Sequence, residues 1–130
     1  MDSQYFDNNK FQMNEMELIF DDNDNVLDGI KQAMYEHNIS KAEIVGFKGK
    51  IRNISLNYFQ KSSMKSIQII EDKEVIRASG EFKFDFVRNT NFGRIRIMYK
   101  DEGKTFEGIL VKAKAVDGLK ITLRYLNIKE

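Results

Sequence analysis

The chain has 130 residues, enough for one domain with a substantial hydrophobic core but too few for two. Hydrophobic residues make up 42% and charged residues 32%, which is typical of a folded, soluble protein, and no apolar run is long enough to cross a bilayer. The absence of cysteine excludes disulfides, thiolate metal sites and cysteine nucleophiles. The acidic first twenty residues do not form a signal peptide, so a cytoplasmic location is expected.

The net charge of +1 conceals an uneven distribution of charge along the chain. Residues 1–30 carry eight acids and one base, whereas residues 31–70 carry seven bases and two acids. This asymmetry gives either a basic face that attracts phosphate, or two halves that neutralise each other on folding. The sequence leaves both possibilities open.

One helix is predicted, close to the start of the chain. Residues 1–12 are polar and irregular, which predicts a loosely ordered start, and residues 13–20 alternate as a first strand. The short polar side chains of residues 21–25 are suited to capping a helix N-terminus. A helix is therefore expected over about 25–37, ended by Asn38 in a left-handed conformation. Its predicted buried stripe comprises Val26, Leu27, Ile30, Ala33, Met34 and His37.

From residue 42 onward the hydrophobic period changes to two, which predicts strands. Asp101-Glu102-Gly103 and Asp117-Gly118 are typical of tight hairpin turns, and loops this short exclude parallel crossovers. The sequence therefore predicts a single α+β domain, 1–130, with a mostly antiparallel sheet of about eight strands. The strands after the helix are expected at 43–59, divided near Gly46 and Gly49, and at 66–70, 75–78, 81–87, 94–99, 105–115 and 119–127.

Three features that suggest chemistry have simpler structural interpretations. His37 has no partner nucleophile and is expected to cap or pack at the end of the helix. Asp21–Asp24 lacks the glycine and the glutamate of a calcium loop, so it is interpreted as a helix cap. Gly46 and Gly49 are not followed by a helix, so they cannot form a phosphate-binding loop of the dinucleotide type.

Two pairs of cations alternate along predicted strands, so each pair projects from one face. They are Arg94 with Arg96, and Lys112 with Lys114. If their strands are neighbours, the four side chains form a patch for phosphate, carboxylate or an acidic partner; otherwise they belong to an ordinary solvated face.

Phe82, Phe84 and Phe86 raise a similar pair of alternatives. They form either a stacking platform for bases or one face of the core. Exposure decides between the two, and the sequence does not show exposure.

The order of several short motifs resembles the plant-and-prokaryote-conserved (PPC) domain family over about residues 14–127. An acidic helix start is followed by the glycine-containing strand region 44–59, then by Glu74–Gly80 ending in Ser-Gly. Phe106–Leu110 falls where the family has a Gly-Gly-His-Leu segment. The resemblance implies an antiparallel sheet packed on a helix, assembly as a homotrimer, and a DNA-binding role of the kind described for bacterial members.

Many bacterial members of that family carry a His-x-His pair on a strand together with the histidine of Gly-Gly-His-Leu, a set suited to binding a metal. The corresponding positions here are Arg94, Arg96 and Ile109. Neither side-chain type is a zinc ligand, so no metal, no cofactor and no enzymatic activity are expected. The position instead favours an anion.

The sequence thus predicts a non-enzymatic binding or regulatory domain with no membrane association. Lys48, Lys50 and Arg52 are the candidate nucleic-acid contacts, and Arg94, Arg96 and Lys112 are the candidate anion contacts. The alternatives to DNA binding are an anionic metabolite held in clefts between subunits around the two arginines, or a protein partner bound by the acidic segment 1–28.

Overall fold

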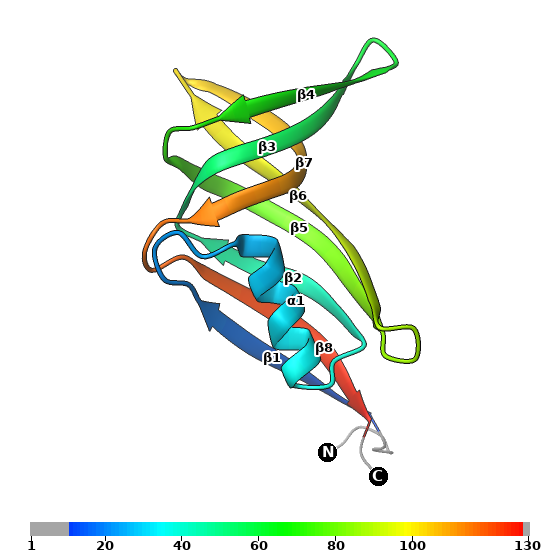
Figure 1. The fold of residues 1–130 in the computed structure, drawn as a ribbon. Helices are drawn as coiled ribbons and strands as arrows, with labels where there is room; N and C mark the ends of the chain where they lie inside the picture. The colour runs from blue at the N-terminus through cyan, green and yellow to red at the C-terminus, as the bar shows by residue number, and fades with distance from the viewer. Residues whose placement is uncertain (1–10, 129–130) are drawn as a thin grey trace.

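A computed structural model describes residues 11–128 of the chain as one curved antiparallel sheet with a helix against one of its faces (Figure 1). The helix is α1 (Val26–Glu36). The eight strands are β1 (Phe11–Ile19), β2 (Lys41–Lys48), β3 (Lys50–Gln60), β4 (Ser63–Ile69), β5 (Lys73–Asp85), β6 (Thr90–Asp101), β7 (Lys104–Ala115) and β8 (Lys120–Ile128).

The strands lie in the order β1-β8-β2-β5-β6-β7-β3-β4. All pairings of named strands are antiparallel, as the short loops require. A further short pairing joins the start of β3 to the start of β5, with Lys50 opposite Glu74 and Ile51 opposite Lys73. Because β3 also pairs with β7, the sheet curls back so that β3, β5, β6 and β7 close into a ring.

The helix forms as its caps predict. The Asn25 side-chain oxygen accepts a hydrogen bond from the Asp28 N–H at 3.0 Å, and Asn38 adopts φ 55° just beyond the last turn. Val26, Ile30, Ala33 and Met34 are buried against the sheet. The prediction that His37 belongs to this stripe is wrong, because His37 is the C-cap residue: the chain leaves helical geometry there and the side chain is exposed.

The predicted eight antiparallel strands and single helix are confirmed, but the fold is β-rich rather than a balanced α+β structure, since the helix has only 11 residues. The predicted strands 75–78 and 81–87 are one continuous strand, β5. Gly80 lies within β5 and does not end the strand. At this position the β6 backbone comes so close that a Cβ would lie 3.1 Å from the Arg94 carbonyl carbon and closer still to its oxygen, so a glycine is required. β6 pairs with this strand from Val75 to Asp85, with one register shift between Val75 and Arg77.

Gly49 separates β2 from β3 with φ +131°, a conformation that side chains disfavour, and the pairing of β2 with β8 shifts register between Ile44 and Gly46. The predicted division of the 43–59 strand near Gly46 and Gly49 is therefore confirmed. β1 begins at Phe11, so the prediction of a loose start over residues 1–12 is wrong for residues 11 and 12; residues 1–10 lie outside the described part of the chain. The one helix of the described chain is too short to span a membrane.

Candidate functional site: a cationic hollow on the outer face of the sheet

Strands β5 and β6 share an inner face, which lies on the side of the helix, and an outer face, which is open to solvent. On the inner face, Phe82 is fully buried and Phe84 lies with its ring centroid 5.7 Å from that of Tyr35 on α1. Side chains alternate along a strand, so residues one position away point to the outer face. Ile95 and Ile97 of β6 are buried in the same way, which places Arg94 and Arg96 outside.

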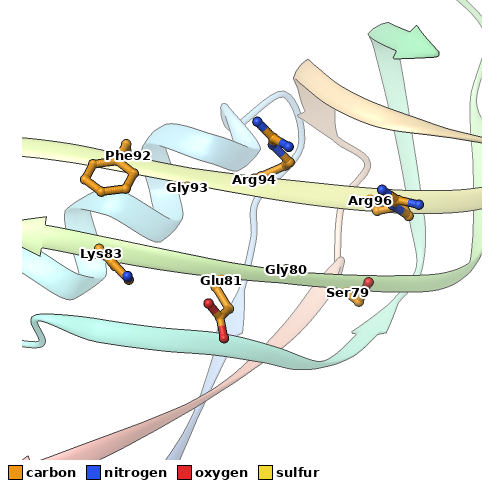
Figure 2. A pocket seen from close by; sticks show the side chains of 8 residues that line it. All are labelled: Ser79, Gly80, Glu81, Lys83, Phe92, Gly93, Arg94 and Arg96. Atoms are coloured by element: carbon orange, nitrogen blue, oxygen red, sulfur yellow. The ribbon is translucent and has the colours of Figure 1, made fainter. Parts of the chain in front are cut away.

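The pairing register brings a set of polar side chains together on this outer face. Ser79 lies opposite Arg96, Glu81 opposite Arg94, and Lys83 opposite Phe92. Figure 2 shows Phe92, Arg94 and Arg96 following one another along β6, with Lys83, Glu81 and Ser79 along β5. These six residues, with Gly80 and Gly93, line an open hollow of about 530 Å³, which we call the cationic hollow.

Two glycines keep the strands close together beneath the hollow. A Cβ on Gly93 would lie 2.5 Å from Cγ and 2.7 Å from Cε2 of the buried Phe82 ring on the opposite strand. Gly80 faces the backbone of β6 at a similarly close approach. The floor of the cationic hollow is therefore bare backbone over a packed aromatic ring.

The hollow holds three cations and one acid, and two of the cations have no acidic partner. Within the described residues, Arg94 and Lys83 make no ion pair closer than 4.0 Å, although Glu81 is the neighbour of Arg94 across the strands. Arg96 has a loose contact with Glu107, at 3.9 Å between Nη1 and Oε2. Unpaired guanidinium groups next to a hollow are available to an anion from solution.

Lys112 and Lys114 do not join this group as the sequence allowed. The pairing of β7 with β6 ends at Leu110, and β7 then continues beside β3, where Lys112 lies opposite Ser55 and Lys114 opposite Arg52. Neither lysine lines the cationic hollow. Arg94 and Arg96 are thus brought together, and the two lysines are placed elsewhere on the sheet.

Arg52, one of the three candidate nucleic-acid contacts, is held by acids. Its guanidinium contacts Asp72 at 2.9 Å and Asp22 at 3.1 Å, and also donates to the Asn23 side chain at 3.0 Å. The hydrogen bonds to Asp72 and Asp22 raise the pKa of Arg52, while Arg52 lowers the pKa of Asp72. Asp22 belongs to the acidic segment 1–30 and Arg52 to the basic segment 31–70, so this one ion pair agrees with the interpretation in which the two segments neutralise each other.

Lys48 and Lys50 are both exposed, on either side of Gly49. Lys48 lies opposite Lys120 of β8, and Lys50 opposite Glu74 of β5. Lys120 was not among the predicted contacts, because only the pairing of β2 with β8 brings it beside Lys48. We refer to Lys48, Lys50 and Lys120 as the lysine cluster.

The remaining sequence candidates have structural roles. Asp24 accepts the Asp21 N–H at 2.9 Å, as part of the turn before the helix, and the described residues contain no group of three acids or histidines able to hold a metal. Of the three alternating phenylalanines, Phe82 belongs to the core and Phe84 packs against it, whereas Phe86 is 40% exposed and stacks on Phe84 at 4.5 Å. The aromatic ring that lies among cations is instead Phe92, which is 64% exposed.

Four residues of the hollow were not predicted from the sequence as site residues: Phe92, Lys83, Glu81 and Ser79. A signal for Phe92 was present: it lies two residues before Arg94, so the alternation that pairs Arg94 with Arg96 includes it. No comparable signal identified the β5 residues, since their position depends on which strand pairs with β6.

The positions expected to correspond to the histidines of related proteins are neighbours in space. Arg96 and Ile109 are directly opposite each other on β6 and β7, and Arg94 is two residues along the same face. Neither guanidinium nor a hydrocarbon side chain donates a lone pair to a metal, so this set does not fit a metal ion.

The chain is a small β-rich domain with an open hollow lined by three cations on the outer face of its sheet. The sequence profile of the Plants and Prokaryotes Conserved (PCC) domain matches residues 8–126, and the chain belongs to this family. This is the family whose motifs the sequence resembles. No curated protein matches the sequence.

Solved structures share the fold at low sequence identity. A plant- and prokaryote-conserved protein from Pyrococcus horikoshii is 21% identical with a TM-score of 0.74, covering 96% of this chain and 87% of that one. A metal-containing protein from Archaeoglobus fulgidus is 18% identical with a TM-score of 0.75, covering 89% and 81%. A candidate DNA-binding protein from Bacteroides thetaiotaomicron is 14% identical with a TM-score of 0.65, covering 90% and 84%. At these identities the likeness shows the fold alone.

Proposed function

We propose that this chain is a cytoplasmic, non-enzymatic binding module that holds an anionic group in the cationic hollow. The observation that carries the proposal is the presence of Arg94 and Lys83 beside the hollow without acidic partners, with Arg96 only loosely paired. A guanidinium offers a planar fork of donors that matches a phosphate or carboxylate.

Thermal stabilisation by anions tests this function. We expect phosphate and sulfate, and small phosphorylated and carboxylated metabolites, to raise the melting temperature of the native protein, because a ligand that binds only the folded state stabilises it. The double variant R94Q/R96Q should lose the effect. The matched control is R88Q, since Arg88 is an exposed arginine in the loop between β5 and β6 that does not line the hollow. An unchanged melting temperature across the panel would refute the proposal.

DNA is the second candidate ligand. Its support is that structures with this fold from Bacteroides thetaiotaomicron and Ralstonia eutropha are described as candidate DNA-binding proteins, and that the lysine cluster is exposed. Arg52 is engaged by Asp72 and Asp22, so we leave it out of the proposed contact surface. If the lysine cluster binds phosphates, affinity for duplex DNA should fall steeply with salt, and K48Q/K50Q/K120Q should flatten that dependence. Absence of retention at low salt would exclude DNA.

We also propose that the domain assembles as a homotrimer, as the family resemblance implies. Exposed apolar side chains support contact between copies, above all on the β3–β4 hairpin, where Phe59 is 70% exposed and Met64 49%. Light scattering on the purified protein should give three times the mass of 15.2 kDa. A monomeric mass at micromolar concentration would contradict the assembly.

A further inference from the structure

The ring of Phe92 lies at one end of the cationic hollow and is 64% exposed. It makes no ring contact with another aromatic side chain of the described chain, whereas Phe84 and Phe106 are each paired with a neighbouring ring. An exposed aromatic face among cations is the arrangement that proteins use to stack a nucleobase. The other polar groups of the hollow indicate what would be attached to that base.

Phe92, Arg94 and Arg96 are separated by single residues on one strand, so each step along the outer face is about 7 Å. A base and its 5′-phosphate are separated by one sugar ring. A base on Phe92 therefore places a phosphate within reach of the flexible Arg94 side chain, with Arg96 on its far side, as Figure 2 shows by the order of the three side chains.

The opposite strand, β5, contributes Glu81 and Lys83 to the lining of the hollow. Glu81 is the cross-strand neighbour of Arg94, and Figure 2 shows its carboxylate extending from β5 to the side away from β6. Lys83 lies opposite Phe92 in the strand pairing and adds a cation to the hollow. The volume of about 530 Å³ is within the size range of small-ligand sites.

We infer that the group bound in the cationic hollow is a nucleotide unit, with its base stacked on Phe92 and its phosphate between Arg94 and Arg96. The inference rests on the proposed anion-binding function and deepens it. The same unit is available as a free nucleotide or within a single strand, and the two sources are separated by the experiment below.

Calorimetric titration with adenosine 5′-monophosphate, ribose 5-phosphate, inorganic phosphate and a short single-stranded oligonucleotide tests the inference on the native protein. Stacking of a base on an aromatic ring predicts that the nucleotide binds about 5- to 150-fold more tightly than ribose 5-phosphate. F92L should remove this preference and leave ribose 5-phosphate binding unchanged, whereas F92Y should keep it. F106L is the matched control, since Phe106 is 43% exposed on β7 and does not line the hollow.

Equal affinity for the nucleotide and for ribose 5-phosphate would overturn the inference while leaving the proposed anion-binding function intact. Failure of all the phosphate compounds to bind would refute that function itself. If the oligonucleotide binds more tightly than the mononucleotide and F92L weakens both, the inference is supported and the unit comes from a strand. If the mononucleotide binds at least as tightly, the inference is supported and the unit is a free nucleotide.

Discussion

Replacing Gly93 with alanine tests how β5 and β6 pack beneath the cationic hollow. The new methyl group would lie 2.5 Å from Cγ of Phe82, whereas carbon atoms pack best at about 3.5–4.0 Å. Cδ2 of the same ring would lie closer still, so the ring would have to retreat by more than about 1 Å. It has no room to do so, because Phe82 is fully buried in the core between the sheet and the helix.

The expected cost follows from these distances. Overpacking a core by one methyl group costs about 1–3 kcal/mol, and replacing a strand glycine by alanine returns about 0.5–1 kcal/mol of backbone entropy. We therefore expect G93A to lower the free energy of unfolding by about 1–2 kcal/mol. For a domain of this size, that lowers the melting temperature by roughly 4–8 °C. Urea denaturation followed by circular dichroism measures the change.

A double-mutant cycle identifies the cause of the loss. F82L replaces the ring by a smaller side chain, so G93A should cost less in the F82L background than in the native one, and the two free-energy changes should not add. If G93A costs the same in both backgrounds, the contact between Gly93 and Phe82 is not what requires a glycine. The packing argument for the floor of the hollow would then be refuted.

Three further predictions concern stability and ionisation. N25A should destabilise the protein by about 1 kcal/mol in urea denaturation, because it removes the acceptor for the Asp28 N–H, and N25D should retain most of the stability. The hydrogen bond from Arg52 lowers the pKa of Asp72, so their pairing stabilises the fold fully above the ordinary carboxyl pKa of 3.8 and is lost as the pH falls through the lowered value. The stability difference between the native protein and R52Q should therefore narrow in acid; a difference independent of pH would contradict this. Burial raises the pKa of Tyr99, so spectrophotometric titration should show one of the five tyrosines ionising above 10.0, and Y99F should remove that step.

The sequence by itself determined the features that depend on neighbours along the chain. The helix and its caps follow from residues 21–38, because a cap bonds to backbone only a few residues away. The hairpin at Glu102-Gly103 was predictable for the same reason: both residues adopt positive φ, as a two-residue turn requires. The alternation of Arg94 and Arg96 with buried isoleucines likewise fixed their common face.

Only the tertiary structure decided which strands are neighbours, and the composition of the candidate site depends on that. β5 supplies Lys83 and Glu81 to the hollow because it pairs with β6, and β7 carries Lys112 away because it leaves β6 at Leu110 to follow β3. The sequence cannot rank these pairings, since each strand is amphipathic and could accept several partners.

The tertiary structure also decided which charged side chains form ion pairs. Arg52 and Arg94 are both arginines on strands, but folding brings Asp22 and Asp72 to Arg52 and leaves Arg94 without an ion pair within the described chain. Asp22 is 30 residues from Arg52 and Asp72 is 20 residues away, so no local pattern joins them. The sequence determined that the chain has cations on strands, and the long-range contacts of the fold decided which of them remain available to a ligand.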